Sequence, residues 1–432
     1  MKRVKVVGAG LAGCEAAFQL AERGIPVLLA DMKPKKKSSA HTSDAFSELV
    51  CSNSLRSDRL QNAVGLLKEE MRRLNSLIIA CADKTRVPAG GALAVDREGF
   101  SALITERIRT HKNIEIVEEE VLVLPETPAI VATGPLTDGE LASDIERFFG
   151  DNLHFYDAAA PIVEYDSLDM EKVFRASRYD RGDDYLNCAM DANQYNAFIE
   201  ALINAETVPL REFETLKVFE GCMPVEVMAK RGHMTLAYGP LKPVGLKDAR
   251  TNTRPFAVVQ LRQDDAAGRL YNIVGFQTNL KFSEQKRVFG MIPGLENANF
   301  VRYGVMHRNS FINSPGKLDA SYQTRALPGL YFAGQLTGVE GYVESAASGL
   351  VAGVNLAHFM LKKEPMDFTR TTAIGALAHY VSEYAGKDFQ PMNVNFGIMD
   401  ALENPPRGKL ERYEQIGERS LNKINEIIAK KM

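Results

Sequence analysis

The chain has 432 residues, a length that predicts two or three domains, because single hydrophobic cores stop growing at about 250–300 residues. Hydrophobic residues make up 45% of the chain and charged residues 25%, as in an ordinary globular protein. The net charge of −3 excludes nucleic-acid binding through bulk positive charge, so any such binding would depend on a local basic face.

No apolar run approaches the roughly 20 residues of a membrane span. A strand is predicted almost at the N-terminus, which leaves no room for a signal peptide, so we expect a cytoplasmic protein. The five cysteines have neither the pattern of a disulfide framework nor the CxxC spacing of a zinc site. We therefore expect reduced thiols and no metal site.

The N-terminal segment carries the strongest motif. A predicted strand at Val4–Val7 is followed by Gly8-Ala9-Gly10-Leu11-Ala12-Gly13, a predicted helix, and a strand over 27–30 that ends in Asp31. The glycines permit a tight turn, a close approach of backbone to a pyrophosphate, and close packing of the helix on the sheet. The helix N-terminus favours phosphate, and a carboxylate about 20 residues on can bind an adenosine ribose. This order predicts a dinucleotide site formed by Gly8, Ala9, Gly10, Gly13 and Asp31.

A basic loop with lysines at positions 33, 35, 36 and 37 follows this motif. It is either a solvated loop or a group of cations that attracts a polyanion to the nucleotide site. The sequence leaves both interpretations open.

Regular spacing predicts several further elements. Apolar residues at helical spacing over 62–81 predict one packed helix. A glycine-rich turn near 88–91 is expected to lead into a capped helix that ends at about Arg109, followed by paired strands at Ile114–Val117 and Val121–Leu124. A buried strand from Ala129 is then predicted to end at Thr133 and Gly134, where backbone would pass a flavin.

From about 151 to 300 the pattern changes to short mixed elements with many charges, which predicts an inserted domain. Its basic residues, interleaved with aromatic ones, either form a solvated surface or track phosphates and stack bases. Cys222 lies in this part, between Gly221 and Met223-Pro224, in a predicted constrained turn. Cys51 lies in a polar loop over 46–57, although a cysteine is most often a small buried hydrophobe.

Near the C-terminus a nucleotide-binding pattern returns. A strand after Gly329 leads into a glycine turn and a helix of small residues, which predicts that Gly334, Gln335 and Gly341 lie against a flavin. The segment 411–431 is predicted to be a structural amphipathic helix. The expected fold class is α/β: a Rossmann-like FAD-binding fold of the two-dinucleotide-binding type, with a mostly parallel sheet and an inserted α+β domain. The expected parts are the first FAD-binding part (1–150), the inserted substrate or RNA domain (151–300), the second FAD-binding part (301–370) and a C-terminal helical segment (371–432).

Five longer motifs carry a resemblance that covers nearly the whole chain. They are Glu48-Leu-Val-Cys51-Ser-Asn-Ser-Leu-Arg56-Ser, Phe219-Glu-Gly-Cys222-Met-Pro, the run from Val258 through Arg262 to Gly268, Tyr303-Gly-Val-Met-His307-Arg-Asn309, and the run from Gly334 to Gly349. Together they resemble the folate- and FAD-dependent tRNA (uracil-5-)-methyltransferases, relatives of the larger flavoproteins that modify the wobble uridine. One departure is Asp31, where that family is expected to have Glu.

The resemblance implies an enzyme that makes 5-methyluridine at position 54 of the tRNA T loop. It implies 5,10-methylenetetrahydrofolate as one-carbon donor, FAD as cofactor, and NADPH or NADH as a reductant that binds transiently. A thiolate that adds to uracil C6 makes C5 nucleophilic, and Cys222 is expected to be that nucleophile. Cys51 is expected near the flavin, to handle the methylene carbon or the C5 proton. His307 and Arg308 are candidates for packing against the folate or flavin ring.

Several alternatives stay open. The same chemistry could act on a uridine of 23S rRNA, and a wobble-uridine flavoprotein is disfavoured by the short chain. An FAD-binding RNA chaperone or scaffold without turnover would tolerate loss of both cysteines. A small-molecule flavin oxidoreductase would need neither RNA nor folate. The oligomeric state and the division of labour between the two cysteines are not determined by the sequence.

Overall fold

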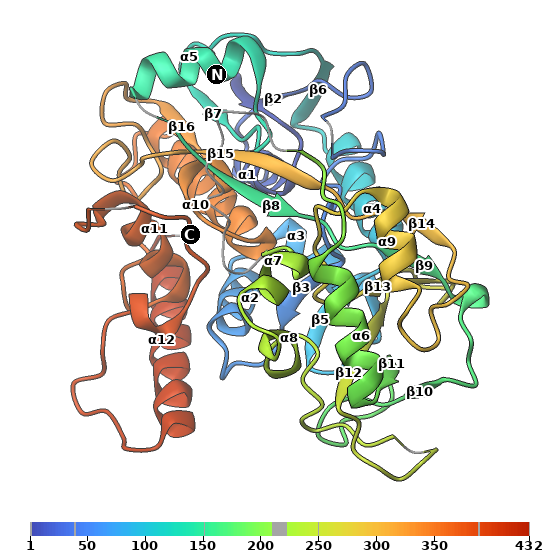
Figure 1. The fold of residues 1–432 in the computed structure, drawn as a ribbon. Helices are drawn as coiled ribbons and strands as arrows, with labels where there is room; N and C mark the ends of the chain where they lie inside the picture. Colours follow the sequence, from blue (N-terminus) through green and yellow to red (C-terminus); the bar gives the residue numbers. More distant parts are fainter. Residues whose placement is uncertain are drawn as a thin grey trace.

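The computed structural model describes residues 2–38, 40–150, 152–209, 223–248, 250–387 and 389–431. Within these ranges, the side chains of residues 152–157, 307, 308 and 431 are not described. Figure 1 shows two sheet-containing parts, joined by a long two-stranded ribbon, with the C-terminal helices packed along one side.

A five-stranded parallel sheet is the centre of the first part. Its order is β16-β7-β1-β2-β6, and every neighbouring pair is parallel. The strands are β1 (Val4–Val7), β2 (Val27–Asp31), β6 (Ile114–Glu118), β7 (Ala129–Val131) and β16 (Leu330–Phe332). The predicted mostly parallel α/β sheet is thus confirmed. Because the strand order reverses at β1, the turn after β1 opens at a switch point of the sheet, where ligands bind in such folds.

Helices α1 (Leu11–Glu22) and α10 (Tyr342–Met360) pack against each other at very short range. A Cβ atom added at Gly349 would lie 2.2 Å from the carbonyl oxygen of Ala12, so only glycine fits there. The run of small residues in α10 therefore brings the C-terminal nucleotide-like pattern onto the N-terminal one.

The helix predicted over 62–81 is in fact two helices, α2 (Ala63–Arg73) and α3 (Leu77–Lys84). Asn75, between them, has φ 58°, a left-handed conformation that ends the first helix. Glu15 of α1 is buried and accepts hydrogen bonds from the first backbone N–H groups of α3. Apolar spacing continued through the break, and that is why the sequence predicted one helix.

Two other local predictions need correction. The glycine-rich turn leads first into strand β5 (Ala92–Val95) and only then into α4 (Arg97–Arg109). Strand β5 lies between β3 (Ser54–Ser57) and β4 (Arg86–Val87) in a small sheet. The strand expected at Val121–Leu124 is wrong: residues 119–128, all described, contain no strand. Val123 is 60% exposed, so this segment has no buried face to hold it in a sheet.

The second part is built on a six-stranded antiparallel sheet of order β10-β11-β12-β13-β9-β14. Helices of this part pack with the sheet into a buried cluster that draws on residues 163–300. The first part has its own cluster, drawn from residues 4–149 and 312–427. The elements of the second part are β9 (Ile162–Glu164), β10 (Val173–Arg175), β11 (Tyr185–Met190), β12 (Ala257–Gln263), β13 (Leu270–Ile273), β14 (Phe300–Arg302), α6 (Ala192–Ile203), α7 (Val225–Lys230), α8 (Thr235–Tyr238) and α9 (Phe282–Phe289).

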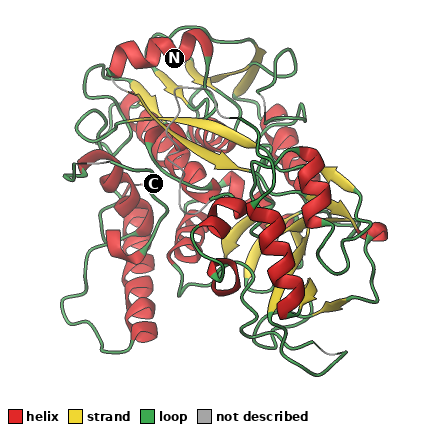
Figure 2. Cartoon of the chain, in the orientation of Figure 1, coloured by secondary structure: helices red, strands yellow, loops and turns green. Residues whose placement is uncertain are grey.

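The chain passes between the two parts along an antiparallel ribbon of β8 (Asn152–Ala158) and β15 (Met306–Ile312). Figure 2 shows these two long strands side by side. β8 carries the chain out of the first part, and β15 returns it. An inserted domain with antiparallel strands and helices, as the sequence predicted, is therefore present.

The C-terminal helices α11 (Ala373–Glu383) and α12 (Lys409–Lys431) pack on the first part. Glu70 of α2 is buried and accepts hydrogen bonds from the N–H groups of Ala373 and Ile374 and from the hydroxyl of Ser420. Burial raises the pKa of Glu70 to about 7. In the described part of the chain, no helix combines the length and the apolar character needed to cross a bilayer.

Replacing Gly349 with Ala should destabilise the first part, because the new methyl group would meet the Ala12 carbonyl at 2.2 Å and force α1 and α10 apart. Such overpacking costs about 1–3 kcal/mol. Thermal or urea unfolding would measure the loss. Gly417→Ala is the matched control: it also lies inside a helix, but its nearest atom would be 3.9 Å away. Equal stability of the two variants would contradict this account of the packing.

Candidate functional site

A cleft opens at the carboxyl ends of β1, β2, β7 and β16, and predicted cofactor residues line it. Ala9 and Gly13 lie behind this surface: Ala9 is fully buried, and a Cβ at Gly13 would lie 1.8 Å from the carbonyl oxygen of Gly8. The predicted residues that line the cleft are Gly8, Gly10, Asp31, Thr133, Gly134, Gly334 and Gln335.

The loop between β1 and α1 has the geometry expected of a phosphate-binding turn. Gly8 has φ +97°, which an L side chain would strain. Asp31 accepts a hydrogen bond from the Ala9 N–H at 2.6 Å, so its carboxylate fixes the loop. Gly10 precedes α1 and provides no side-chain cap, so the first N–H groups of α1 are available to an anion in the cleft.

The lysines at positions 33, 35, 36 and 37 interact with neighbouring groups of the protein. Their ammonium groups contact neighbouring carboxylates and carbonyls, and this favours a structural loop over a site that attracts a polyanion. The contacts are Lys33 with the Ala45 carbonyl, Lys35 with the Glu118 carbonyl, Lys36 with Glu120, and Lys37 with Asp44 and the Thr42 carbonyl.

A second cleft adjoins the first and contains Cys51 and Gly341. The two clefts share five lining residues, so they lie side by side. Residues of the second part and of the ribbon also line it, including Arg262, Gln277 and Asn309. The shared residues are Val50, Pro135, Leu136, Gln335 and Tyr342.

Cys51 is held by Tyr342. The phenol oxygen accepts hydrogen bonds from the N–H of Cys51 at 2.8 Å and, more weakly, from that of Ser52 at 3.3 Å. Its sulfur contact is also 2.8 Å, and with both N–H groups donating to the oxygen, the phenol proton points to Cys51 Sγ. Burial, together with the neighbouring thiol, raises the pKa of Tyr342 well above its ordinary value. Tyr342 therefore remains a donor, and a donor favours the thiolate form of Cys51.

The other described cysteines lie in surroundings that disfavour the thiolate. Burial raises the pKa of Cys14 and of Cys188 to about 12 and that of Cys81 to about 11. None of the three lines either cleft. Cys222, the expected nucleophile, lies outside the described residues.

His307 and Arg308 lie on β15, and their side chains are not described. They directly precede Asn309 on the same strand, and Asn309 lines the second cleft and is 3% exposed.

The sequence alone did not identify the side chains that surround Cys51. Tyr342 and Arg262 lie within the motifs that carry the family resemblance, but the sequence predicted no role for either residue. The sequence pattern of β12 could have pointed to Arg262. Gln260 and Arg262 recur at the two-residue spacing of one sheet face, in a strand that is buried along most of its length. Buried polar residues at that spacing indicate a second surface for the sheet to contact.

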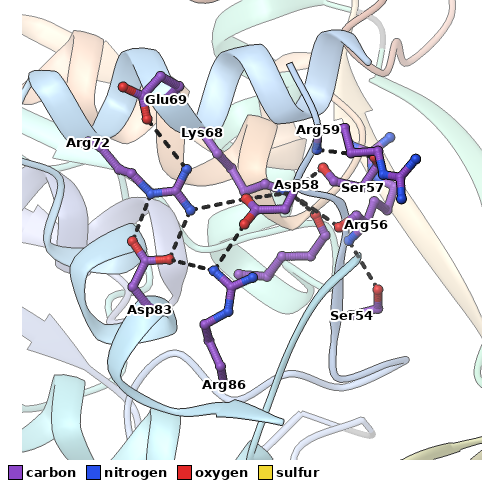
Figure 3. A network of polar contacts seen from close by, with 11 residues as sticks. Ser54, Arg56, Ser57, Asp58, Arg59, Lys68, Glu69, Arg72, Asp83 and Arg86 are labelled. Carbon is purple, nitrogen blue, oxygen red and sulfur yellow. Dashed lines mark hydrogen bonds and ion pairs between the residues drawn. The ribbon is translucent and has the colours of Figure 1, made fainter. Parts of the chain in front are cut away.

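The C-terminal end of the cysteine loop, which spans residues 46–57, is fixed by a polar network (Figure 3). Lys68 of α2 is fully buried, and its ammonium group donates to the carbonyl oxygens of Leu55 (2.8 Å), Arg56 (3.2 Å) and Ser57 (2.6 Å). Asp58 accepts hydrogen bonds from Arg72 and Arg86, each at 3.0 Å. The backbone from Leu55 to Asp58 is thus held by side chains from outside the segment.

This network determines where Arg56 lies. Arg56 has φ 61°, an uncommon conformation for a residue with a side chain. Its guanidinium lines the second cleft and pairs with the fully buried carboxylate of Glu344 in α10. The second cleft is therefore lined by a guanidinium group from the first part, Arg56, and by one from the second part, Arg262.

Replacing Lys68 with Met should lower the free energy of unfolding by about 2–4 kcal/mol, because three buried carbonyls lose their donor. Urea unfolding of both proteins tests this. Lys84→Met is the control, since Lys84 is exposed on the next helix and should change stability by less than about 0.5 kcal/mol. A near-neutral Lys68→Met would rule out the network as the support of this segment.

Lys68 should also leave a signature in the pH dependence of stability. Burial lowers its pKa from 10.5 to about 7. Between these two values the unfolded chain binds more protons than the folded one, so this residue makes stability rise with pH across that window. Chemical unfolding from pH 7 to 10 should show a rise that is weaker in Lys68→Met. Identical slopes in the two proteins would contradict the lowered pKa.

The comparisons with known proteins agree with this geometry. The family described as "Glucose inhibited division protein A" matches residues 3–364. A Listeria monocytogenes protein named "Methylenetetrahydrofolate--tRNA-(uracil-5-)-methyltransferase TrmFO" is 60% identical over 428 residues, which are 99% of each chain. A protein of the same name from Acetivibrio thermocellus is 60% identical over 430 residues, again 99% of each chain.

Among solved structures, GidA from Aquifex aeolicus superposes with a TM-score of 0.72 at 16% identity, covering 98% of this chain and 73% of that one. A second crystal form of the same protein gives 0.70 at 17% identity, with 98% and 76% covered. These two structures show the Rossmann-like fold. With the extent of the sequence identity, the matches show that this chain belongs to the GidA family and, within it, to the methylenetetrahydrofolate--tRNA-(uracil-5-)-methyltransferases.

Proposed function

We propose that this enzyme methylates C5 of a uridine in tRNA, at position 54 of the T loop, with 5,10-methylenetetrahydrofolate as the carbon donor. FAD is the proposed cofactor, and NADPH or NADH the proposed reductant. The names of the full-length relatives support the folate and tRNA assignments. The observation that carries the proposal is the shared lining of the two clefts, since the cleft that contains Cys51 adjoins the cleft lined by the dinucleotide-binding motif.

The described residues fit FAD in the first cleft. Gly8 turns the chain with a positive φ, the N-terminus of α1 carries no side-chain cap, and the carboxylate of Asp31 stands at the end of β2. Thr133, Gly134 and Gln335 would line the path toward the second cleft, with Gly341 beyond them. FAD, when bound and reduced, would supply the hydride that converts the transferred methylene group into methyl.

The two cysteines have separate proposed roles. The Cys222 thiolate would add to uracil C6, which makes C5 nucleophilic toward the methylene carbon. The bonds from that carbon to the folate nitrogens would break as the carbon is transferred and the C5 proton is lost, which leaves an exocyclic methylene group. Hydride addition to this group would then expel the thiolate and restore the ring. Cys51, in the second cleft beside Tyr342, is placed to accept the C5 proton or to handle the methylene carbon. His307 and Arg308, which lie two residues and one residue before the cleft residue Asn309 on β15, would pack on the folate or flavin ring.

A division of the chain accompanies this proposal: FAD binding by 1–150 and 301–370, substrate or RNA binding by 151–300, and a C-terminal support over 371–432. The two separate hydrophobic clusters support it, since one draws only on residues within 163–300. The target base must leave its stack to reach the clefts, which costs a few kcal/mol and less for a loop base. Binding should weaken as salt rises.

The test is transfer of labelled carbon from methylenetetrahydrofolate, with NADPH present, into unmodified tRNA and rRNA supplied separately. We expect label in uridine 54 of tRNA, none in rRNA, and complete loss of label with Cys222→Ala while FAD stays bound. Cys188→Ala is the matched control, since that thiol is buried away from both clefts and its loss should leave transfer intact.

Each other outcome changes a specific part of the proposal. Label in rRNA alone would keep the chemistry and replace the substrate. Label that persists with Cys222→Ala would remove that residue as the nucleophile. Absence of label in either RNA, with FAD bound and reducible, would favour a flavin-binding RNA scaffold or a small-molecule oxidoreductase.

A further inference from the structure

The sheet of the second part has a polar face that is buried. Val259 and Leu261 of β12 pack into the hydrophobic cluster, while Gln260 and Arg262 alternate with them and face the other way. Gln260 donates to the side-chain oxygen of Asn187 on β11 at 2.9 Å, directly across the strand pair. A buried polar face is costly unless every group is satisfied, so these residues need partners beyond the sheet.

Arg262 finds its partners in the cysteine loop. It is 7% exposed, and it donates through Nε to the Asn53 side-chain oxygen at 3.0 Å and through a terminal nitrogen to Ser52 Oγ at 2.7 Å. The Asn53 amide in turn donates to the carbonyls of Val95 (2.9 Å) and Gln263 (2.8 Å). The two residues directly after Cys51 are therefore fixed by the inserted sheet.

A second arginine holds the other side of the loop. Arg97 forms a two-pronged ion pair with Asp264, at 3.0 and 2.9 Å, and donates to the carbonyl of Leu49. Leu49 lies two residues before Cys51. The loop is thus held on both sides of the cysteine by groups that span the two parts of the molecule.

The charges of this cluster do not balance. Arg97 and Asp264 neutralise each other, and among the described residues no carboxylate lies within ion-pair distance of Arg262. Burial lowers the pKa of Arg262, whereas negative charge on Tyr185, Asp264 or Cys51 raises it. Ionisation of the Cys51 thiol would supply the missing negative charge next to this buried cation.

Other described titratable groups also lie near Cys51. Burial and the cation of Arg97 lower the pKa of Arg302, and negative charge on Tyr342, Glu48 or Cys51 opposes this shift. The phenol of Tyr342 lies 2.8 Å from the sulfur, and since its oxygen already accepts two N–H groups, its proton is available to the sulfur. The remaining groups at the second cleft are Arg56, paired with Glu344, and Glu340, which accepts a hydrogen bond from Gln335.

We propose that Arg262 is a positioning residue for Cys51: from the inserted sheet it fixes Ser52 and Asn53, and its buried positive charge favours the thiolate. Arg97 and Asp264 complete the clamp without adding net charge. The proposal deepens the proposed function, on which it rests for the use of the thiolate. It concerns the ionisation of one side chain and not the RNA or the folate.

The test measures alkylation of Cys51 by iodoacetamide across pH 5.5–10 in the flavin-loaded enzyme, read at the Cys51 peptide by mass spectrometry. Iodoacetamide reacts with thiolates, so the midpoint of the rate reports ionisation. Arg262→Gln should move the midpoint up by about one pH unit and slow alkylation about tenfold at pH values below both midpoints. At pH values above both midpoints, the variant should be alkylated at the same rate as the original enzyme. An unchanged midpoint would overturn the proposal.

A change of opposite sign separates charge from simple loosening of the loop. Asp264→Asn removes a negative charge from the same clamp and should speed alkylation at low pH, whereas a purely structural clamp predicts the same direction for both variants. Arg262→Lys, which keeps the charge, should stay within about threefold of the original rate. If Arg262→Gln loses its fold, as judged by flavin retention, these two variants decide the matter. Slower alkylation in Asp264→Asn would then overturn the proposal.

Arg178→Gln is the matched control. Arg178 donates at 2.9 Å to Gln260, which lies on the same strand as Arg262. It also donates to two backbone carbonyls of the second part, at 2.7 Å each, and none of these contacts is with the cysteine loop. Its loss should leave the Cys51 midpoint unchanged, and an equal shift in this variant would overturn a specific role for Arg262. Because the assay needs no RNA or folate, failure of the clamp and failure of the methyl-transfer function are distinguishable.

Discussion

The close approach of α1 to α10 is the contact on which the rest of the site depends. Gly349 lets α10 lie against the backbone of Ala12, and this brings residues after β16 beside the glycine loop after β1. Ser345 of the same helix lines the cleft together with Gly8 and Gly10. Tyr342, the first residue of α10, reaches Cys51 from the same helix. One backbone contact therefore places both the cofactor cleft and the partner of the thiol.

The cysteine loop shows how a segment with little regular structure can still be rigid. Side chains from three directions hold it: Lys68 in α2 donates to backbone carbonyls, Tyr342 in α10 accepts from a backbone N–H, and Arg262 in β12 donates to the side-chain oxygens of Ser52 and Asn53. Each of these would be expensive to bury without partners, and the loop supplies the partners. The same hydrogen bonds therefore offset the cost of burying these side chains and keep the loop ordered.

The sequence predicted what depends on local pattern and missed what depends on distant contacts. The strands at Val4–Val7 and 27–31, the helix from Leu11 and the small-residue helix near the C-terminus were correct, because apolar periodicity and glycine spacing encode them directly. The break at Asn75 was missed, because it depends on Glu15 capping the next helix from another part of the chain. The same limit explains Arg262 and Lys68, whose partners lie far away in sequence and become neighbours only in the folded molecule.

The ribbon of β8 and β15 has a consequence for how such a molecule can change over time. Asn152 pairs with Ile312, so the chain leaves the first part and returns to it at adjacent points. The two ends of the insert lie on neighbouring strands, so the distance between them stays nearly the same whatever the insert contains. The entropic cost of closing a longer insert also grows only slowly with its length. Evolution can therefore enlarge, trim or exchange the substrate-facing module while the nucleotide-binding core keeps its packing.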